Sequence, residues 1–132
     1  MSGVKNYLNL MKLHSDKIFT KIEGMTHEDW IRDENLRDAV CMRLMSLAEC
    51  VKEHIRENPA VIKNYPQIPW ADIVRFRDKI AHHYEGTDYD VVLGILESDI
   101  QPLYEIIIKL TAMEMPEAKL QHKKTKDKGF SR

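Results

Sequence analysis

The chain has 132 residues, of which 43% are hydrophobic and 31% are charged. This length is enough for one compact domain with its own core and too short for two ordinary domains. High charge with only five glycines favours amphipathic helices and disfavours a turn-rich β-sandwich. We therefore expect a single all-α domain.

The first residues, Met1 to Lys17, contain no uninterrupted apolar stretch, and no window approaches the roughly 20 apolar residues that cross a bilayer. This pattern predicts a soluble, cytoplasmic protein without a membrane segment. Cys41 and Cys50 are nine positions apart, which places them on opposite sides of a helix and prevents a disulfide there. We expect both to be reduced, inert core thiols.

The net charge of −1 is unevenly distributed along the chain. Residues 117–132 hold six Lys or Arg and two acidic residues, so they carry +4, whereas the first 116 residues carry −5. Such a segment either attracts RNA or an acidic partner, or is a disordered, solubilising end. We expect residues 1–116 to form the folded domain and 117–132 to be a basic, disordered tail.

The first helix is predicted from apolar residues that recur at spacings of three and four between Val4 and Ile22. Gly24 is expected to end it, since glycine readily adopts the left-handed conformation that terminates helices. Thr26 and Asp29, three positions apart, form a capping-box pattern. This pattern predicts a short helix that carries Trp30.

A second long helix is predicted from about Asn35, with an apolar stripe that lasts until Asn58-Pro59. The segment from Pro59 to Pro69 contains three prolines and is predicted to be a loop. The next helix is expected to begin with Pro69 in its first turn and to end near Glu85-Gly86. One face of this helix is predicted to carry Trp70, Ile73, Val74, Arg77, Ile80, Ala81 and Tyr84.

The last helix is predicted to follow Thr87, which with Asp90 repeats the capping pattern, and to extend to about Met115. Pro102 is expected to interrupt or kink it, because proline lacks the backbone donor that a helix interior uses. Four main helices joined by short connections bury their apolar stripes best as an antiparallel bundle.

Arg77 is unusual because the predicted apolar face includes it. Tyr84 follows seven positions later and therefore projects at nearly the same angle. Burying a guanidinium without a partner is costly. Arg77 is therefore expected either to pair with an acidic side chain such as Glu49 or to line a cleft that an anion can enter.

The spacing of Arg77, His82 and Tyr84 resembles the RX4HXY motif of the HepT-like HEPN family. Pro69-Trp70, the segment Leu47-Ala48-Glu49-Cys50, and Gly86 followed by Asp88 also resemble that family's pattern. The similarity spans about Val4 to Met115. It implies an antiparallel bundle of four to five helices that forms a homodimer with the motif helices near the dyad.

The resemblance also implies a metal-independent endoribonuclease that cleaves RNA by attack of the ribose 2′-hydroxyl, without a cofactor. Such a reaction needs proton transfer and positive charge near the phosphoryl oxygens. His82 is the candidate general acid or base, and Arg77 the candidate phosphate-binding residue. Asp78 is expected to orient this pair, and His83 is a secondary candidate.

One geometric difficulty accompanies these roles. Arg77 and His82 are five positions apart and diverge by about 140° on a regular helix. They converge only if the helix unwinds near His82 or if a second subunit contributes. We expect no metal site, because the adjacent histidines His82 and His83 point apart and no further Cys or His lies at helical ligand spacing.

Tyr84 has a separate role by resemblance. In toxins of this type, within toxin–antitoxin systems similar to type VII, a cognate nucleotidyltransferase antitoxin of the MNT type transfers AMP to the motif tyrosine. Added bulk and negative charge beside Arg77 would repel RNA. Two alternatives remain: Tyr84 packs against Trp70 or the opposite subunit, and the whole domain is a non-catalytic module that binds a nucleotide or a partner.

Overall fold

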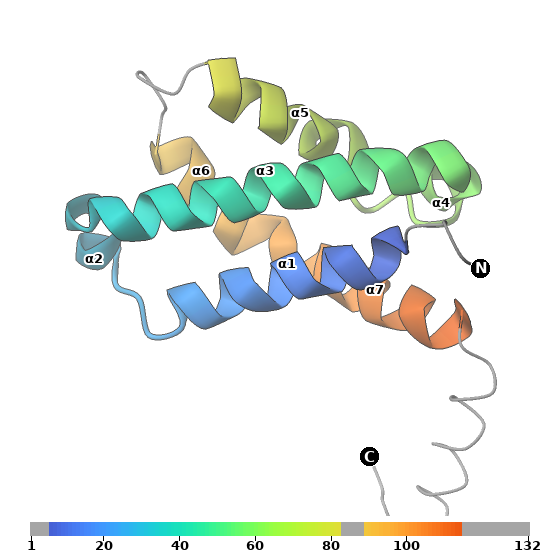
Figure 1. The fold of residues 1–132 in the computed structure, drawn as a ribbon, viewed down its shortest axis with the longest axis horizontal. Coiled ribbons are helices and arrows are strands. Elements are labelled where there is room, and N and C mark those ends of the chain that lie inside the picture. The colour runs from blue at the N-terminus through green and yellow to red at the C-terminus, as the bar shows by residue number, and fades with distance from the viewer. Residues whose placement is uncertain (1–5, 83–88, 115–132) are drawn as a thin grey trace, which may run out of the picture.

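The computed structural model describes residues 6–82 and 89–114 (Figure 1). These residues form an all-helical bundle, and no strand occurs among them. The fold class predicted from the sequence is thus confirmed. The helices are α1 (Tyr7–Ile22), α2 (His27–Arg32), α3 (Glu34–Glu57), α4 (Ala60–Asn64), α5 (Trp70–His82), α6 (Tyr89–Ser98) and α7 (Ile100–Glu114).

Helix α3 lies at the centre of the arrangement (Figure 1). It packs against α1 on one side and against α5 on the other, and α1 in turn packs against α7. The long helices α1 and α3 run antiparallel, with the short helices α2 and α4 at the two ends of α3. The motif-bearing helix α5 is therefore held mainly by its contact with α3.

The boundaries of the first two helices follow the predicted signals. Gly24 has a φ of 72°, the left-handed conformation expected after the end of α1. The capping box of α2 is present: Thr26 Oγ1 accepts from the Asp29 backbone N–H, and Asp29 Oδ2 accepts from the Thr26 N–H, both at 3.0 Å. These contacts satisfy backbone donors that the helix itself leaves unpaired.

The predicted loop between Pro59 and Pro69 is partly wrong, because it contains the short helix α4. Pro59 already has helical angles, with φ −62° and ψ −20°, and so starts this turn of helix without losing a needed donor. Val61 is buried in the core and gives the turn a tertiary contact. Five residues are too few for a periodic pattern to reveal a helix.

The interruption predicted near Pro102 is confirmed and lies at Asp99, between α6 and α7. A proline ring clashes with the carbonyl four positions earlier, which here belongs to Ser98, the last residue of α6. Pro102 itself lies in the first turn of α7, where its missing N–H costs nothing. The predicted cap at Thr87 lies outside the described residues.

The core is formed by one apolar stripe from each long helix. Cys41 and Cys50 are both buried and not bonded to each other, and burial raises the pKa of the Cys41 thiol to about 11. Within the described residues, no helix is long and apolar enough to cross a membrane. The side chains with essentially no exposed surface include Met11, Ile18, Trp30, Val40, Leu44, Leu47, Val51, Ile73, Ile100, Leu103 and Ile107.

Leu47 and Met42 on α3 provide a matched test of this core. Leu47 is fully buried, whereas the side chain of Met42 is 62% exposed. We expect Leu47→Ala to lower the free energy of unfolding by about 2–5 kcal/mol, because it removes buried apolar surface and leaves a cavity. Met42→Ala should change it by no more than about 0.5 kcal/mol. Urea denaturation of both variants measures the difference, and equal losses would contradict the placement of Leu47.

Candidate active site

Arg77 pairs with the carboxylate that the sequence analysis named. Its Nε lies 3.5 Å from Glu49 Oε1 on α3, and its Nη1 lies 3.9 Å from Asp78 Oδ1. The side chains of Arg77 and Glu49 are 54% and 46% exposed. An ion pair this exposed contributes little to stability, about 0–1 kcal/mol, and leaves the guanidinium accessible to another anion.

The expectation that Arg77 shares the core-facing stripe of its helix is wrong. The buried stripe of α5 runs through Trp70, Ile73, Phe76 and Ile80, so Phe76 occupies the turn where Arg77 was expected. Arg77 lies at the edge of that stripe and faces the adjacent helix α3. Its charge therefore remains hydrated and needs no buried partner.

The helical backbone continues without interruption to His82, the last residue of α5. Arg77 and His82 are therefore both part of one α-helix, and residues five apart on such a helix diverge by about 140°. The backbone of α5 therefore does not unwind between Arg77 and His82, and unwinding just after His82 lies outside the described residues. His83 and Tyr84 lie outside the described residues.

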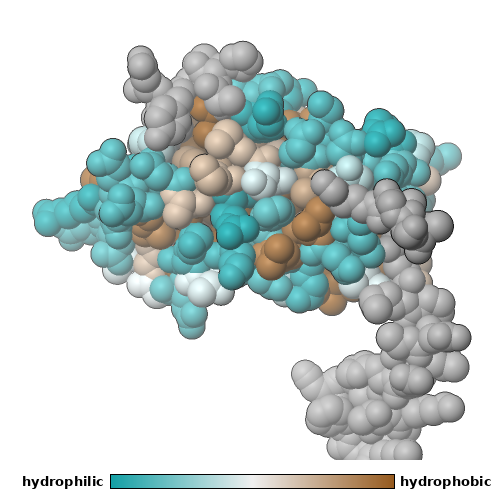
Figure 2. Space-filling model, in the orientation of Figure 1, coloured by the Kyte–Doolittle hydropathy of each residue, from teal (hydrophilic) through white to brown (hydrophobic). Residues whose placement is uncertain are grey.

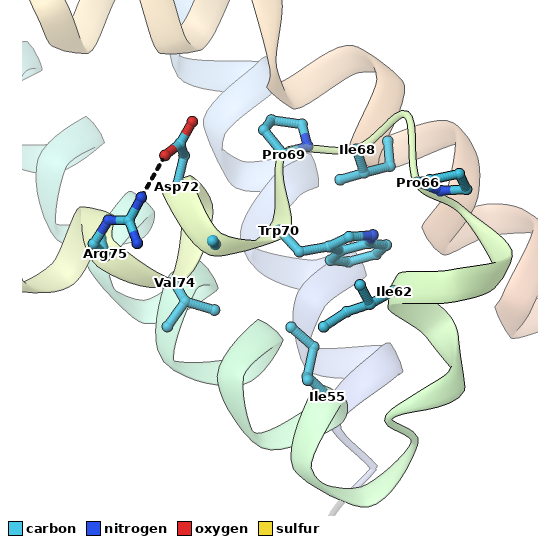
Figure 3. Close-up of a pocket in the computed structure, with 10 residues that line it drawn as sticks. Ile55, Ile62, Pro66, Ile68, Pro69, Trp70, Asp72, Val74 and Arg75 are labelled. Atoms are coloured by element: carbon cyan, nitrogen blue, oxygen red, sulfur yellow. Dashed lines mark hydrogen bonds and ion pairs between the residues drawn. The ribbon is translucent and has the colours of Figure 1, made fainter.

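The start of α5 is anchored by Trp70. This side chain is buried, and its Nε1 donates a hydrogen bond of 2.8 Å to the backbone oxygen of Tyr65. Figure 3 shows Trp70 lying beside Ile62 and Ile55, at an apolar pocket of about 540 Å³, with the ion pair of Asp72 and Arg75 at its edge. This packing fixes where the motif helix begins.

The chain is anchored again directly after residues 83–88. Trp30 Nε1 donates to the backbone oxygen of Tyr89 at 2.9 Å, and the two rings meet edge to face with centroids 6.1 Å apart. The Arg37 guanidinium lies 4.6 Å from the centroid of the Tyr89 ring and donates to the backbone oxygens of Trp30 and Ile31. These contacts fix the start of α6.

Arg77 lines an open groove of about 840 Å³ on the outer face of α1 and α3. The groove combines apolar and polar side chains, and the face in Figure 2 likewise shows hydrophobic patches among hydrophilic ones. Among the residues whose side chains are described, no group of three His, Cys, Asp or Glu could hold a metal ion. The groove is lined by Tyr7, Leu10, His14, Met42, Met45, Ser46, Glu49, Cys50, Glu53 and Arg77.

His14 is a titratable residue of this groove that the sequence analysis did not single out. Its Nδ1 lies 3.1 Å from Arg43 Nη1. Burial and, second, the Arg43 charge lower the pKa of His14. Because a guanidinium only donates, Nδ1 must accept, which requires a neutral ring protonated at Nε2. The one available signal was spacing, since Tyr7, Leu10 and His14 recur at three and four along α1.

Comparisons with known proteins agree on one family. The family model described as Ribonuclease HepT-like matches residues 9–110. A Methanocaldococcus jannaschii protein provisionally named as an RNase is 37% identical over 87 residues, which cover 63% of this chain and 69% of that protein. A Caldanaerobacter subterraneus protein with the same kind of provisional name is 26% identical over 114 residues, covering 86% and 99%.

A Thermococcus cleftensis protein, provisionally named ribonuclease HepT, is 34% identical over 77 residues, which cover 58% of this chain and 66% of that protein. No solved structure matches the chain significantly. Fold and site together define a helical-bundle protein with an accessible arginine beside an open groove. The chain belongs to the HepT-like ribonuclease family, which confirms the resemblance stated from its motif.

The neutral state of His14 generates a prediction about pH. A histidine has a pKa near 6.5 in an unfolded chain, and the pKa of His14 is lower than that in the folded protein. The unfolded state then binds the proton more readily, so stability is full above about pH 6.5 and falls as the pH drops toward the folded-state pKa. When the pH is lowered from 7.5 to 5.5, we expect the free energy of unfolding to fall less in the His14→Gln variant than in the parent protein.

Urea denaturation at the two pH values measures this difference. A direct NMR titration of His14 in Arg43→Met should show its pKa rising relative to the parent protein, because one of the two causes of its depression is removed. An unchanged pKa in Arg43→Met would contradict the assigned contact.

Proposed function

We propose that this protein is a metal-independent endoribonuclease of the HepT type, which cleaves RNA by attack of the ribose 2′-hydroxyl on the adjacent phosphate. The observation that carries the proposal is the position of Arg77 in a chain of this family: a half-exposed guanidinium that lines an open groove. A guanidinium presents a planar set of donors that matches two phosphate oxygens. The names of the relatives agree with this activity.

In the proposed reaction, the 2′-hydroxyl oxygen bonds to phosphorus while the bond from phosphorus to the 5′-oxygen breaks. The 2′-hydroxyl gives up its proton and the leaving 5′-oxygen gains one. His82 is the proposed general base for the first transfer or general acid for the second, since an unperturbed histidine titrates near neutrality, and water serves the other transfer. Arg77 binds the phosphate and stabilises the charge that builds on its oxygens. Asp78 and Glu49, both within 4.0 Å of Arg77, hold the guanidinium in place before RNA arrives.

The proposed active form is a homodimer. The backbone of α5 stays helical to His82, and positions five apart on a regular helix lie about 140° apart around its axis. A cleft in which each motif helix lies near the partner's motif helix would bring the arginine of one subunit to the histidine of the other. The same arrangement would place two motifs at one RNA site.

We further propose that the protein is the toxin of a toxin–antitoxin pair and that AMP addition to Tyr84 neutralises it. Tyr84 follows Arg77 by seven positions, and Tyr89, five positions after it, accepts a hydrogen bond from Trp30 at the start of α6. A phosphodiester on that tyrosine would compete with RNA for Arg77. The partner enzyme would be a nucleotidyltransferase of the MNT type.

Substitution of the two motif residues tests the ribonuclease. We expect Arg77→Ala and His82→Ala each to lower the rate of RNA cleavage, measured in EDTA, by about 10²–10⁴-fold, the range of general acid–base and oxyanion contributions. Arg75→Ala is the matched control, because Arg75 is an exposed arginine of the same helix that pairs with Asp72 and does not line the groove. Cleavage that is absent in the parent protein, or unchanged in both motif variants, would favour the binding module.

Modification of Tyr84 is tested separately. The protein produced with a cognate nucleotidyltransferase should carry AMP at Tyr84 by peptide mass mapping and should lose its cleavage activity. Tyr84→Phe should remain active in the presence of that enzyme, because it lacks the acceptor hydroxyl. Tyr65→Phe, which changes the tyrosine directly after α4, is the control and should still lose its cleavage activity when it is produced with that enzyme. Modification at another tyrosine would refute the assignment.

A further inference from the structure

The groove beside Arg77 is built from two rows of side chains. Along α3, its residues recur every three or four positions from Met42 to Glu53, and along α1 they do so from Tyr7 to His14. Because the two helices run antiparallel, Tyr7 lies at the same end of the groove as Glu53, and His14 lies toward Met42. The groove therefore has two chemically different ends.

The Glu53 end lies close to Arg77. Arg77 pairs with Glu49, and Glu53 follows Glu49 by four positions, which is about 6 Å along a helix axis. This is one helical turn, a distance that the sugar of a nucleotide can bridge between its phosphate and its base. A phosphate on Arg77 would thus place an attached base within reach of Glu53.

Glu53 is oriented by an ion pair with Arg56. Its Oε1 accepts from Arg56 Nε at 2.8 Å and lies 2.6 Å from Arg56 Nη2, and its side chain is only 21% exposed. A carboxylate has acceptor capacity for several further donors, since each oxygen carries two lone pairs. Tyr7 lines the same groove as Glu53, at the end where α1 begins and α3 ends. An aromatic ring and an oriented carboxylate therefore lie together at this end.

We propose that Tyr7 and Glu53 form a nucleobase subsite that prefers guanine at the nucleotide whose phosphate binds Arg77. The inference rests on the proposed ribonuclease function and adds base specificity to it. An ionised carboxylate only accepts hydrogen bonds. Guanine presents two adjacent donors, N1–H and the N2 amine, whereas adenine and cytosine present one amine beside an acceptor, and uracil presents one N–H between two acceptors.

The composition of the groove favours a base over other occupants. Two carboxylates, Glu49 and Glu53, repel a second phosphate, while Leu10 and Met45 supply apolar surface for a neutral ring. Aromatic side chains stack on bases of single-stranded RNA, which is the role assigned to Tyr7. Charged side chains are depleted from the centres of protein interfaces, so the Glu53 end of the groove is a poor match for the core of a contact with a second copy, even where Arg77 at its edge meets the partner's motif helix.

Cleavage of a randomised RNA library by the full chain tests the subsite. The parent protein should prefer guanine over uracil at one position next to the cut by about tenfold, the discrimination typical of a good base contact. Glu53→Gln, whose amide both donates and accepts, should reduce this preference to near one without abolishing cleavage. Glu57→Gln is the matched control, because Glu57 also lies next to Arg56 but does not line the groove.

Titration with GMP and UMP, followed by NMR, gives a second readout that does not depend on cleavage. GMP should bind the parent protein and Glu57→Gln about tenfold more tightly than UMP, and Glu53→Gln should bind both about equally. Cleavage with the same base preference in all three proteins would refute the subsite and leave the ribonuclease intact. If GMP binds with the expected preference but the parent protein cleaves no RNA, the ribonuclease proposal is refuted instead.

Sedimentation distinguishes a second copy as the occupant. If Glu53→Gln shifts the protein from dimer to monomer while Glu57→Gln does not, this groove is a contact between copies and the nucleobase proposal is wrong. An unchanged oligomeric state together with the loss of guanine preference supports it.

Discussion

The packing of α3 between α1 and α5 is the interaction on which the rest of the structure depends. One side of this 24-residue helix supplies the centre of the core, including Leu44, Leu47 and Val51. The same packing leaves a second row of α3, with Glu49 and Glu53, facing outward between its two neighbours. Core formation and groove formation are thus two consequences of one helix orientation.

Much of this fold follows from periodicity and local signals in the sequence. Gly24 and the pair Thr26 and Asp29 mark boundaries correctly because they act through backbone chemistry within a few residues. Pro102 predicts the break in the last helix for the same reason, although the break itself lies at Asp99. The helix after Pro59 escapes prediction because it depends on burial of Val61 in the core, which is a tertiary effect.

The prediction that Arg77 pairs with an acidic side chain is confirmed, but the prediction that Arg77 lies on the core-facing side of its helix is wrong. The cost of burying an unpaired guanidinium predicts an acidic partner for Arg77, with Glu49 as one example, and this pair exists. Counting along the helix places Arg77 among the core residues, because it lies four positions after Ile73, but the direction in which α5 packs buries Phe76 instead. Spacing places His14 on one row of α1 with Tyr7 and Leu10, but its contact with Arg43 could not be predicted, since it depends on how α1 and α3 meet.

The charges around Arg77 favour recognition by close contact over long-range attraction. The first 116 residues carry −5, and Arg77 itself lies within 4.0 Å of Glu49 and Asp78. An RNA phosphate therefore gains little until it reaches the guanidinium, where it exchanges a half-exposed ion pair for charge-assisted, bidentate hydrogen bonds. The exchange costs little because the original pair is weak. If RNA binds as proposed, the first 116 residues supply only this local electrostatic gain, and contacts between the bases and the groove would supply part of the remaining binding energy and depend on which base is present.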